Sequence, residues 1–212
     1  MKIIQVPAAV LNQAVGPVRM TDGQTDGHSD EQSIGHLSPD KRTVNLIINM
    51  IAALEGARNP EGVGLAATQV GVSLAIFVMK PKKDGDVTVC INPRIIKLED
   101  LKREEGSQEN HTSPNISPQD PSSHKPIHEK GLEGCLSIPT IWGSVKRADR
   151  VLLEYTDFNG EHHEQWFEGL EAIIVQHEID HLNGILFTQR VLEQGRELVK
   201  ETEDGNFERF KI

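Results

Sequence analysis

The apolar residues of this chain gather in a few short stretches that long polar runs separate. The stretches LAIFVMK (74–80) and VTVCINP (87–93) are rich in β-branched and aromatic residues, which is typical of strands. Within RVLLEYTDFNGEHHEQWFEG (150–169), the dipeptide Asn159-Gly160 lies between two alternating runs. This arrangement predicts a β-hairpin.

A helical period replaces the alternation near residue 40. The apolar residues there are spaced by 3, 4 and 3 positions, which indicates one buried stripe on a helix that ends near Gly56. They are Val44, Ile47, Ile51 and Leu54. Ser38 and Pro39 precede them as a predicted N-cap and first helical residue.

A second helical pattern occupies GLEAIIVQHEIDHLNGILF (169–187), where an apolar stripe continues into two histidines. The residues on this face are Leu170, Ile173, Ile174, His177 and His181. Gly184 suits the C-terminus of that helix. The final segment, from residue 190 onward, has mixed charge and a middle that we also predict to be helical.

Two polar runs lack any periodicity. Residues 21–41 are rich in Gly, Asp and Ser, and residues 99–130 carry four prolines among many polar residues. Such long unstructured connections are unusual inside a compact domain. We therefore expect a single catalytic domain over residues 1–212 with flexible insertions at 21–41 and 99–130.

Charge and composition narrow the class of protein. The formal net charge of −10 argues against a nucleic-acid-binding surface, which would be basic. No stretch approaches the roughly 20 apolar residues of a membrane span, and the start of the chain is a poor signal peptide. With only two cysteines, a reducing compartment is the simpler expectation.

The stretch QHEIDH (176–181) holds the strongest chemical signal. His177 and His181 are one helical turn apart, so their rings project from the same face and could hold a metal ion. Glu178 would lie close enough to exchange a proton with a water on that metal. The alternative is the polar end of an ordinary buried helix.

The sequence offers more than one third ligand. The extended motif of one metalloprotease class would need a third histidine at position 187, where Phe187 excludes it. Glu201, 20 residues after His181, would give a zinc endopeptidase, although its charged surroundings argue against a buried ligand. Cys135, in EGCLS (133–137), would provide a thiolate.

A glycine-rich stretch, GVGLAATQVG (62–71), completes a set of three motifs. GVGLAATQ, EGCLS and QHEIDH together resemble the three motifs of peptide deformylases, in the same order. The resemblance is close over residues 42–98 and 131–190, faint over 1–20 and absent over 21–40 and 99–130. It implies an α+β fold with antiparallel strands around a central helix that carries the two histidines.

The resemblance assigns roles to individual residues. It implies that Cys135, His177 and His181 hold Fe²⁺, which Zn²⁺, Ni²⁺ or Co²⁺ could replace. It makes Glu178 the general base and then the general acid. The Gln69 side chain and the Leu136 backbone N–H would stabilise the oxyanion.

The implied reaction is hydrolysis of the N-formyl group of formyl-methionine on new peptides, by attack of water on the formyl carbon. The backbone of Val63 and Gly64 would pair with an extended peptide. The methionine pocket would be lined by Glu133, Leu136, Ile173, Ile174 and His177. The resemblance also implies that the protein acts in the bacterial cytoplasm or in an organelle. It implies the ribosome, near its exit tunnel, as a partner.

Three features go beyond the shared pattern or depart from it. Many members of the family carry arginine seven residues after the ligand cysteine, and Trp142 occupies that position here. Pro7-Ala8 replaces a usual Pro-Asp pair. Asp180, beside the site, needs a partner if it is buried, and we expect that partner to be Arg147.

Overall fold

The computed structural model describes residues 1–21, 38–58, 61–101 and 131–211. The helices of the described residues are η1 (Ala9–Asn12), α1 (Lys41–Gly56), η2 (Ala67–Val70), α2 (Leu170–Leu182) and α3 (Phe187–Glu193). The strands are β1 (Met20–Thr21), β2 (Ser38–Pro39), β3 (Gly64–Ala66), β4 (Ile76–Met79), β5 (Thr88–Glu99), β6 (Glu133–Cys135), β7 (Ile138–Gly143), β8 (Arg150–Thr156), β9 (His162–Glu168), β10 (Leu198–Glu201) and β11 (Phe207–Phe210).

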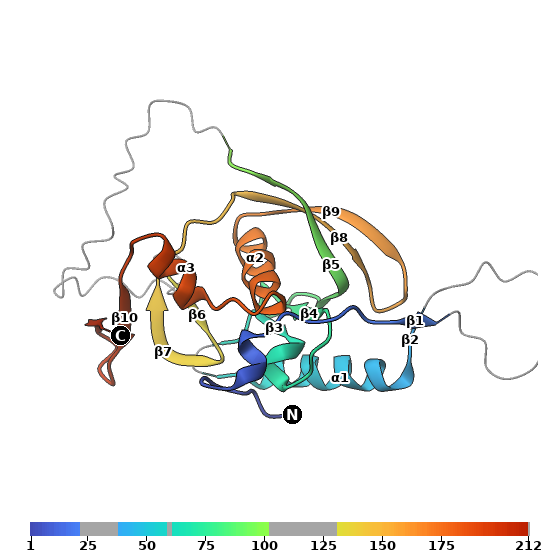
Figure 1. Ribbon diagram of the computed structural model, residues 1–212, viewed down its shortest axis with the longest axis horizontal. Coiled ribbons are helices and arrows are strands. Elements are labelled where there is room, and N and C mark those ends of the chain that lie inside the picture. The colour runs from blue at the N-terminus through green and yellow to red at the C-terminus, as the bar shows by residue number, and fades with distance from the viewer. Residues whose placement is uncertain (22–37, 59–60, 102–130, 212) are drawn as a thin grey trace, which may run out of the picture.

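The strands form antiparallel sheets, which confirms the α+β class. One sheet has the order β3-β4-β5-β8-β9, and a second has the order β11-β10-β7-β6. A two-stranded pair of β1 and β2 completes the set. In Figure 1, α2 lies between the long strands of the first sheet and the smaller sheet that contains β6 and β7.

Helices cover both faces of the five-stranded sheet. Strand β4 shows this most clearly, because all four of its residues are buried. Ile76 and Val78 belong to the apolar cluster that includes α1, whereas Phe77 and Met79 belong to the cluster that includes α2. Successive side chains of a strand point to opposite faces, so α1 and α2 pack on opposite sides of this sheet.

The N-terminus of α1 differs from the prediction. Ser38 and Pro39 lie in strand β2, where they pair with Thr21 and Met20, and the helix begins at Lys41. Asp40 is the N-cap, and its carboxylate accepts a 2.7 Å hydrogen bond from the backbone N–H of Thr43. The prediction of Ser38 as the cap was wrong because an equally good cap lies two residues later. The helix ends at Gly56, as predicted.

Regular secondary structure extends into the ends of both predicted insertions, 21–41 and 99–130. Met20–Thr21 and Ser38–Pro39 are strands, α1 begins at Lys41, and β5 continues to Glu99, so residues 21, 38–39, 41 and 99 are not loop. Most of each predicted insertion lies outside the described residues, which omit 22–37 and 102–130. The strand predicted over 87–93 is therefore correct but too short at its C-terminal end.

The hairpin at Asn159-Gly160 is confirmed, because β8 and β9 pair antiparallel on either side of it. The helical prediction for the middle of the last segment is wrong. Helix α3 ends at Glu193, and the chain then forms the hairpin of β10 and β11, which extends the smaller sheet beside β7. Pairing with an existing strand edge outweighs the weak helical preference of these residues.

No helix among the described segments is both long and apolar enough to cross a membrane.

Candidate active site

Helix α2 positions three of the predicted functional side chains. His177, Glu178 and His181 all lie on it, and Glu178 and His181 are almost fully buried. The helix ends at Leu182, and Gly184 follows with a positive φ of 73°. A side chain at position 184 would collide with the backbone of Asn12 and Gln13. Glycine therefore lets the chain turn sharply just beyond the histidines.

Strand β6 brings Cys135 against the two histidines. The Cys135 Sγ lies 3.2 Å from the His181 Nε2, and ligand atoms of Cys135, His177 and His181 all lie within 4.8 Å of one another. The two imidazole rings are 5.0 Å apart, centroid to centroid. Two nitrogens and one sulfur thus converge from segments that are more than 40 residues apart in the chain.

The chemistry of this group fits a divalent cation. Burial alone would raise the pKa of the Cys135 thiol, but His181 and His177 outweigh it and lower that pKa to about 5. The thiolate is the form that binds a metal ion. A cluster of one thiolate and two imidazoles matches the donors found in three-ligand catalytic metal sites.

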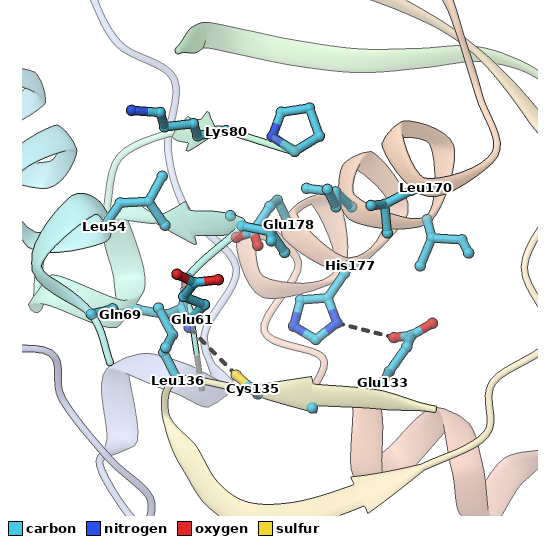
Figure 2. Close-up of a pocket in the computed structure, with 18 of the residues that line it drawn as sticks. Leu54, Glu61, Gln69, Lys80, Glu133, Cys135, Leu136, Leu170, His177 and Glu178 are labelled. Atoms are coloured by element: carbon cyan, nitrogen blue, oxygen red, sulfur yellow. Dashed lines mark hydrogen bonds and ion pairs between the residues drawn. The ribbon is translucent and has the colours of Figure 1, made fainter. Parts of the chain in front are cut away.

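Glu133 orients one of the histidines. Its carboxylate lies 3.0 Å from the Nδ1 of His177 (Figure 2). Arg147 donates to both oxygens of the same carboxylate, at 2.8 and 3.0 Å. Burial would raise the pKa of Glu133, but hydrogen bonds from His177 and Arg147 outweigh it and lower the pKa to about 2. An anionic Glu133 makes Nδ1 the protonated nitrogen, which leaves Nε2 free for a cation.

Glu133 was predicted to line a methionine pocket. It does line the cavity described below, but its two oxygens are already taken by Arg147 and His177. Sequence reasoning missed the contact with His177. A carboxylate two residues before a candidate ligand could have suggested it, because ligating histidines usually donate to such a group.

The predicted partner of Asp180 is confirmed. Arg147 donates to the Asp180 carboxylate at 2.5 Å, and the two side chains are about equally buried. Arg190 of α3 binds the same carboxylate at 2.7 and 3.1 Å, a contact for which the sequence gives no signal. Arg147 therefore links Asp180 of α2 to Glu133 of β6 and holds the helix against the strand.

Glu178 is set up as a proton carrier. It is 3% exposed, and within the described chain its Oε2 has no hydrogen-bond partner. Burial raises its pKa to about 7. A carboxylate with a pKa near neutrality can both accept and return a proton. A Cβ at position 64 would collide with the Glu178 carboxylate, so Gly64 leaves room for it.

The side chain of Gln69 also reaches Cys135, which with His177 and His181 forms the candidate metal-ligand group, called the metal-ligand group below. Its Oε1 accepts a hydrogen bond from the Ala66 N–H at 2.8 Å, which fixes the amide. Its Nε2 then points at the Cys135 Sγ at 3.4 Å and the Ser137 Oγ at 3.2 Å. Figure 2 shows Gln69 and His177 reaching toward the same space from opposite sides.

A cavity of about 600 Å³ opens beside these residues. The predicted site residues on its wall are Val63, Gly64, Gln69, Glu133, Cys135, Leu136, Ile173, Ile174, His177 and Glu178. His181, which is almost fully buried, is not among the residues that line the cavity. Leu54, Leu132 and Leu170 add apolar side chains to the wall of the cavity. The sequence pattern placed Leu54 and Leu170 on the buried stripes of helices and did not assign them to a cavity. Periodicity places a residue on a buried face but does not distinguish the core from a cavity wall.

One edge of this cavity is a free strand edge. Strand β3 is the terminal strand of its sheet in the described part of the chain. The Val63 carbonyl accepts a hydrogen bond from the Lys80 N–H at 2.8 Å, and Gly64 is the next residue in register. Hydrogen bonding alternates along an antiparallel pair, so the polar backbone groups of Gly64 point away from β4.

Glu201 is not part of the metal-ligand group. Its Oε2 accepts a 3.0 Å hydrogen bond from the Trp142 indole, and among the described residues it is Cys135 that joins the two histidines. The possibility of Glu201 as third ligand is therefore not supported.

Comparison with known proteins agrees with this geometry. A peptide deformylase from Halothermothrix orenii is 38% identical over 159 residues, which cover 75% of this chain and 84% of that protein. The crystal structure of a peptide deformylase from Legionella pneumophila matches with a TM-score of 0.62 and 30% identity, over 89% of this chain and 84% of that one. A Met-Ala-Ser-bound class I type b peptide deformylase from Acinetobacter baumannii matches with a TM-score of 0.61 and 27% identity, over 90% and 97% of the two chains.

The match to the family is broader than the motifs indicated. The sequence model of the polypeptide deformylase family matches residues 1–197. The match therefore includes the N-terminal residues where the resemblance of the motifs was faint or absent. With the three motifs gathered around one cavity, this match shows that the chain belongs to the polypeptide deformylase family.

Proposed function

We propose that the protein, as a member of this family, removes the formyl group from N-formylmethionyl peptides by the residues described above. The observation that carries the assignment of roles is the convergence of Cys135, His177 and His181 beside a buried Glu178. One catalytic domain is enough for this, because α2 and β6 supply every proposed ligand.

Cys135, His177 and His181 would hold the metal ion. Bound there, the ion supplies Lewis acidity, which polarises a carbonyl and lowers the pKa of water. We propose Fe²⁺ as the physiological ion, with Zn²⁺, Ni²⁺ or Co²⁺ able to replace it. The mixed nitrogen and sulfur donors support a borderline-soft divalent cation of this series.

Glu178 would carry the proton through the reaction. It takes a proton from the attacking water as the new C–O bond forms at the formyl carbon. It then delivers that proton to the amide nitrogen as the C–N bond breaks, which gives formate and a free amine. Its raised pKa, about 7, suits both steps at neutral pH.

Gln69 and Leu136 would stabilise the negative charge that develops on the formyl oxygen. The Gln69 amide is fixed by its contact with Ala66, so its Nε2 is held beside Cys135 before the substrate binds, and the formyl oxygen would take the place of one of its present acceptors, Cys135 or Ser137. Leu136 lies on the cavity wall next to Cys135 and would donate its backbone N–H. Fixed donors of this kind are effective because they need no reorganisation during the reaction.

The peptide would extend along the free edge of β3. Gly64 offers its backbone N–H and C=O there, as in the addition of a strand to a sheet. The carbonyl of Val63 is already used by Lys80, so the acceptor for the peptide is Gly64. The apolar wall that includes Ile173, Ile174 and Leu132 would receive the methionine side chain.

We also propose the setting in which such a substrate arises. Formyl-methionine begins chains in the bacterial cytoplasm and in organelles. The enzyme would therefore act in one of these compartments on new chains as they leave the ribosome. Its partner would be the ribosome, near the exit tunnel.

Replacement of Glu178 by Ala tests the proton carrier. We expect formate release from formyl-Met-Ala-Ser to fall by about 10²-fold or more, because a positioned general base contributes about 10²–10⁴ in rate. Glu171→Ala, on the same helix but outside the cavity, is the matched control and should retain activity. Turnover by Glu178→Ala at the wild-type rate would refute the assigned role.

A further inference from the structure

The cavity wall carries a carboxylate that the proposed reaction does not use. Glu201 lines the cavity from strand β10, in the smaller sheet, and is half-buried there. Its Oε2 accepts the Trp142 indole N–H, which leaves Oε1 without a hydrogen bond from the described residues. A carboxylate held in this way is a fixed acceptor of known direction.

Other charged groups on the cavity wall are paired or exposed. Lys80 lies 2.6 Å from Glu55, and Lys83 lies 3.5 Å from Glu61, so these charges offset each other. Glu133 is saturated by Arg147 and His177. Asp84 and Arg58 also line the cavity, but both are exposed and water screens them.

Glu201 differs from all of these groups. In the described part of the chain it has no cationic partner, it is half-buried, and it lies in the same cavity as the metal-ligand residues. Among the described carboxylates of the cavity, and apart from Glu178, which we propose carries the proton, Glu201 is the one that is held by a hydrogen bond but has no cationic partner. An uncompensated charge of this kind favours a ligand of the opposite sign.

Trp142 fixes the position of this carboxylate. It is 8% exposed, and its ring lies directly over Gly134, where any Cβ would collide with it. Gly134 and Trp142 are also paired across β6 and β7. Trp142 is thus held on β7, beside the strand that carries Cys135, and its indole N–H binds the Glu201 carboxylate at 3.0 Å.

We infer that Glu201, positioned by Trp142, is a binding site for a cationic side chain, lysine or arginine, on one of the two residues that follow formyl-methionine in the peptide. This inference rests on the proposed function, because it places the substrate along the same cavity. It adds a charge preference to an enzyme whose methionine pocket is apolar.

The preference can be measured with paired peptides. The wild-type holoenzyme is assayed on formyl-Met-Lys-Ser and formyl-Met-Glu-Ser, and on formyl-Met-Ala-Lys and formyl-Met-Ala-Glu. We expect kcat/KM to be about fivefold higher for the lysine peptide in at least one pair, which is the size that a partly exposed ion pair provides. The product peptides, Met-Lys-Ser and Met-Glu-Ser, should differ in binding affinity in the same direction.

Two variants locate the preference. Glu201→Gln keeps a hydrogen-bond acceptor for Trp142 but removes the charge, so the lysine-to-glutamate ratio should fall to about one. Trp142→Phe keeps a ring over Gly134 but removes the N–H, and should lower the ratio part of the way. Glu203→Gln, in the exposed turn after β10, is the matched control and should leave the ratio unchanged.

The outcomes separate this inference from the function on which it rests. If formyl-Met-Ala-Ser is not hydrolysed at all, the proposed function fails. If it is hydrolysed but the wild-type ratio is near one, or Glu201→Gln keeps the wild-type ratio, the charge site is refuted. Loss of the ratio in Glu201→Gln but not in Glu203→Gln supports it.

Discussion

At the scale of single residues, the site depends on how closely the GVGLAATQ loop approaches α2. Gly64 has no side chain, and the Glu178 carboxylate occupies the space that a Cβ would need. Ile174 of the same helix also borders that space. The small residue therefore leaves room for the proposed proton carrier, and we propose that its backbone groups, which point away from β4, also bind the peptide.

Gly64→Ala should consequently impair catalysis more than stability. The added methyl group displaces the Glu178 carboxylate, so we expect kcat/KM for formyl-Met-Ala-Ser to fall by about 10²-fold, comparable to misplacement of a catalytic group. Gly56→Ala, where no atom lies within 4 Å of the added Cβ, is the control and should retain activity. Full activity of Gly64→Ala would show that Glu178 is not held as described.

The contacts of individual polar residues were only partly predictable. The Asp180–Arg147 pair follows from the need of a buried carboxylate for a cation, and the structure contains it. The second cation on Asp180, Arg190, could not be found this way, because one partner already meets that need. Glu133 was correctly placed beside the cavity, but its contact with His177 depends on the tilt of α2 relative to β6, which no local pattern encodes.

At the scale of elements, the β8–β9 hairpin is stabilised by one side chain in its turn. Asp157 accepts hydrogen bonds from the backbone N–H groups of Asn159 and Glu161 at 2.8 and 2.9 Å, and its other oxygen lies 3.0 Å from the His163 Nε2. Burial would raise the pKa of Asp157, but the contacts with His163, Glu161 and Asn159 outweigh it and lower that pKa.

This lowered pKa predicts a pH-dependent contribution to stability. Because the folded state favours the ionised carboxylate, the stabilisation is fully present above the pKa of the unfolded chain, near 3.8, and is lost as the pH falls through the lower folded value. Asp157→Asn should therefore be less stable than wild type at pH 7, and the difference should shrink below about pH 4.

Urea denaturation of both proteins between pH 7 and pH 3 measures this difference. Asp204→Asn, in the exposed turn between β10 and β11, is the control and should show no such trend. A stability difference between Asp157→Asn and wild type that grows as the pH falls would contradict the expected direction.

Helices and strands with a regular spacing of apolar residues were predictable from the sequence. Strands that form only by pairing with a neighbouring strand were not. The two long helices and the β8–β9 hairpin follow from apolar spacing and from Asn159-Gly160. The β10–β11 hairpin was missed because its residues have mixed charge and gain their strand conformation from the edge of β7. The same holds for β2, which is a strand only because β1 lies beside it.

At the scale of the whole molecule, the fold assembles the site from two sheets. The five-stranded sheet presents β3 and packs against α2, and the smaller sheet carries β6 with the cysteine. Neither sheet alone contains the metal-ligand group. The family match over residues 1–197 includes both sheets up to α3 and all of the proposed site residues, which span 63–181.

The sequence predicted this assembly only through the resemblance of three motifs. Spacing alone left two third ligands open, Cys135 and Glu201, since both are compatible with a metal on α2. The choice between Cys135 and Glu201 depends on tertiary structure. Strand β6 reaches the histidines, whereas β10 lies on the far side of β7 from β6.

Metal content of anaerobically purified protein tests the central claim most directly. One ion per chain should be present in the wild type and in Glu201→Ala, and it should be lost from Cys135→Ala together with formate release. Retention of the ion at wild-type stoichiometry in Cys135→Ala, or its loss in Glu201→Ala, would contradict the account.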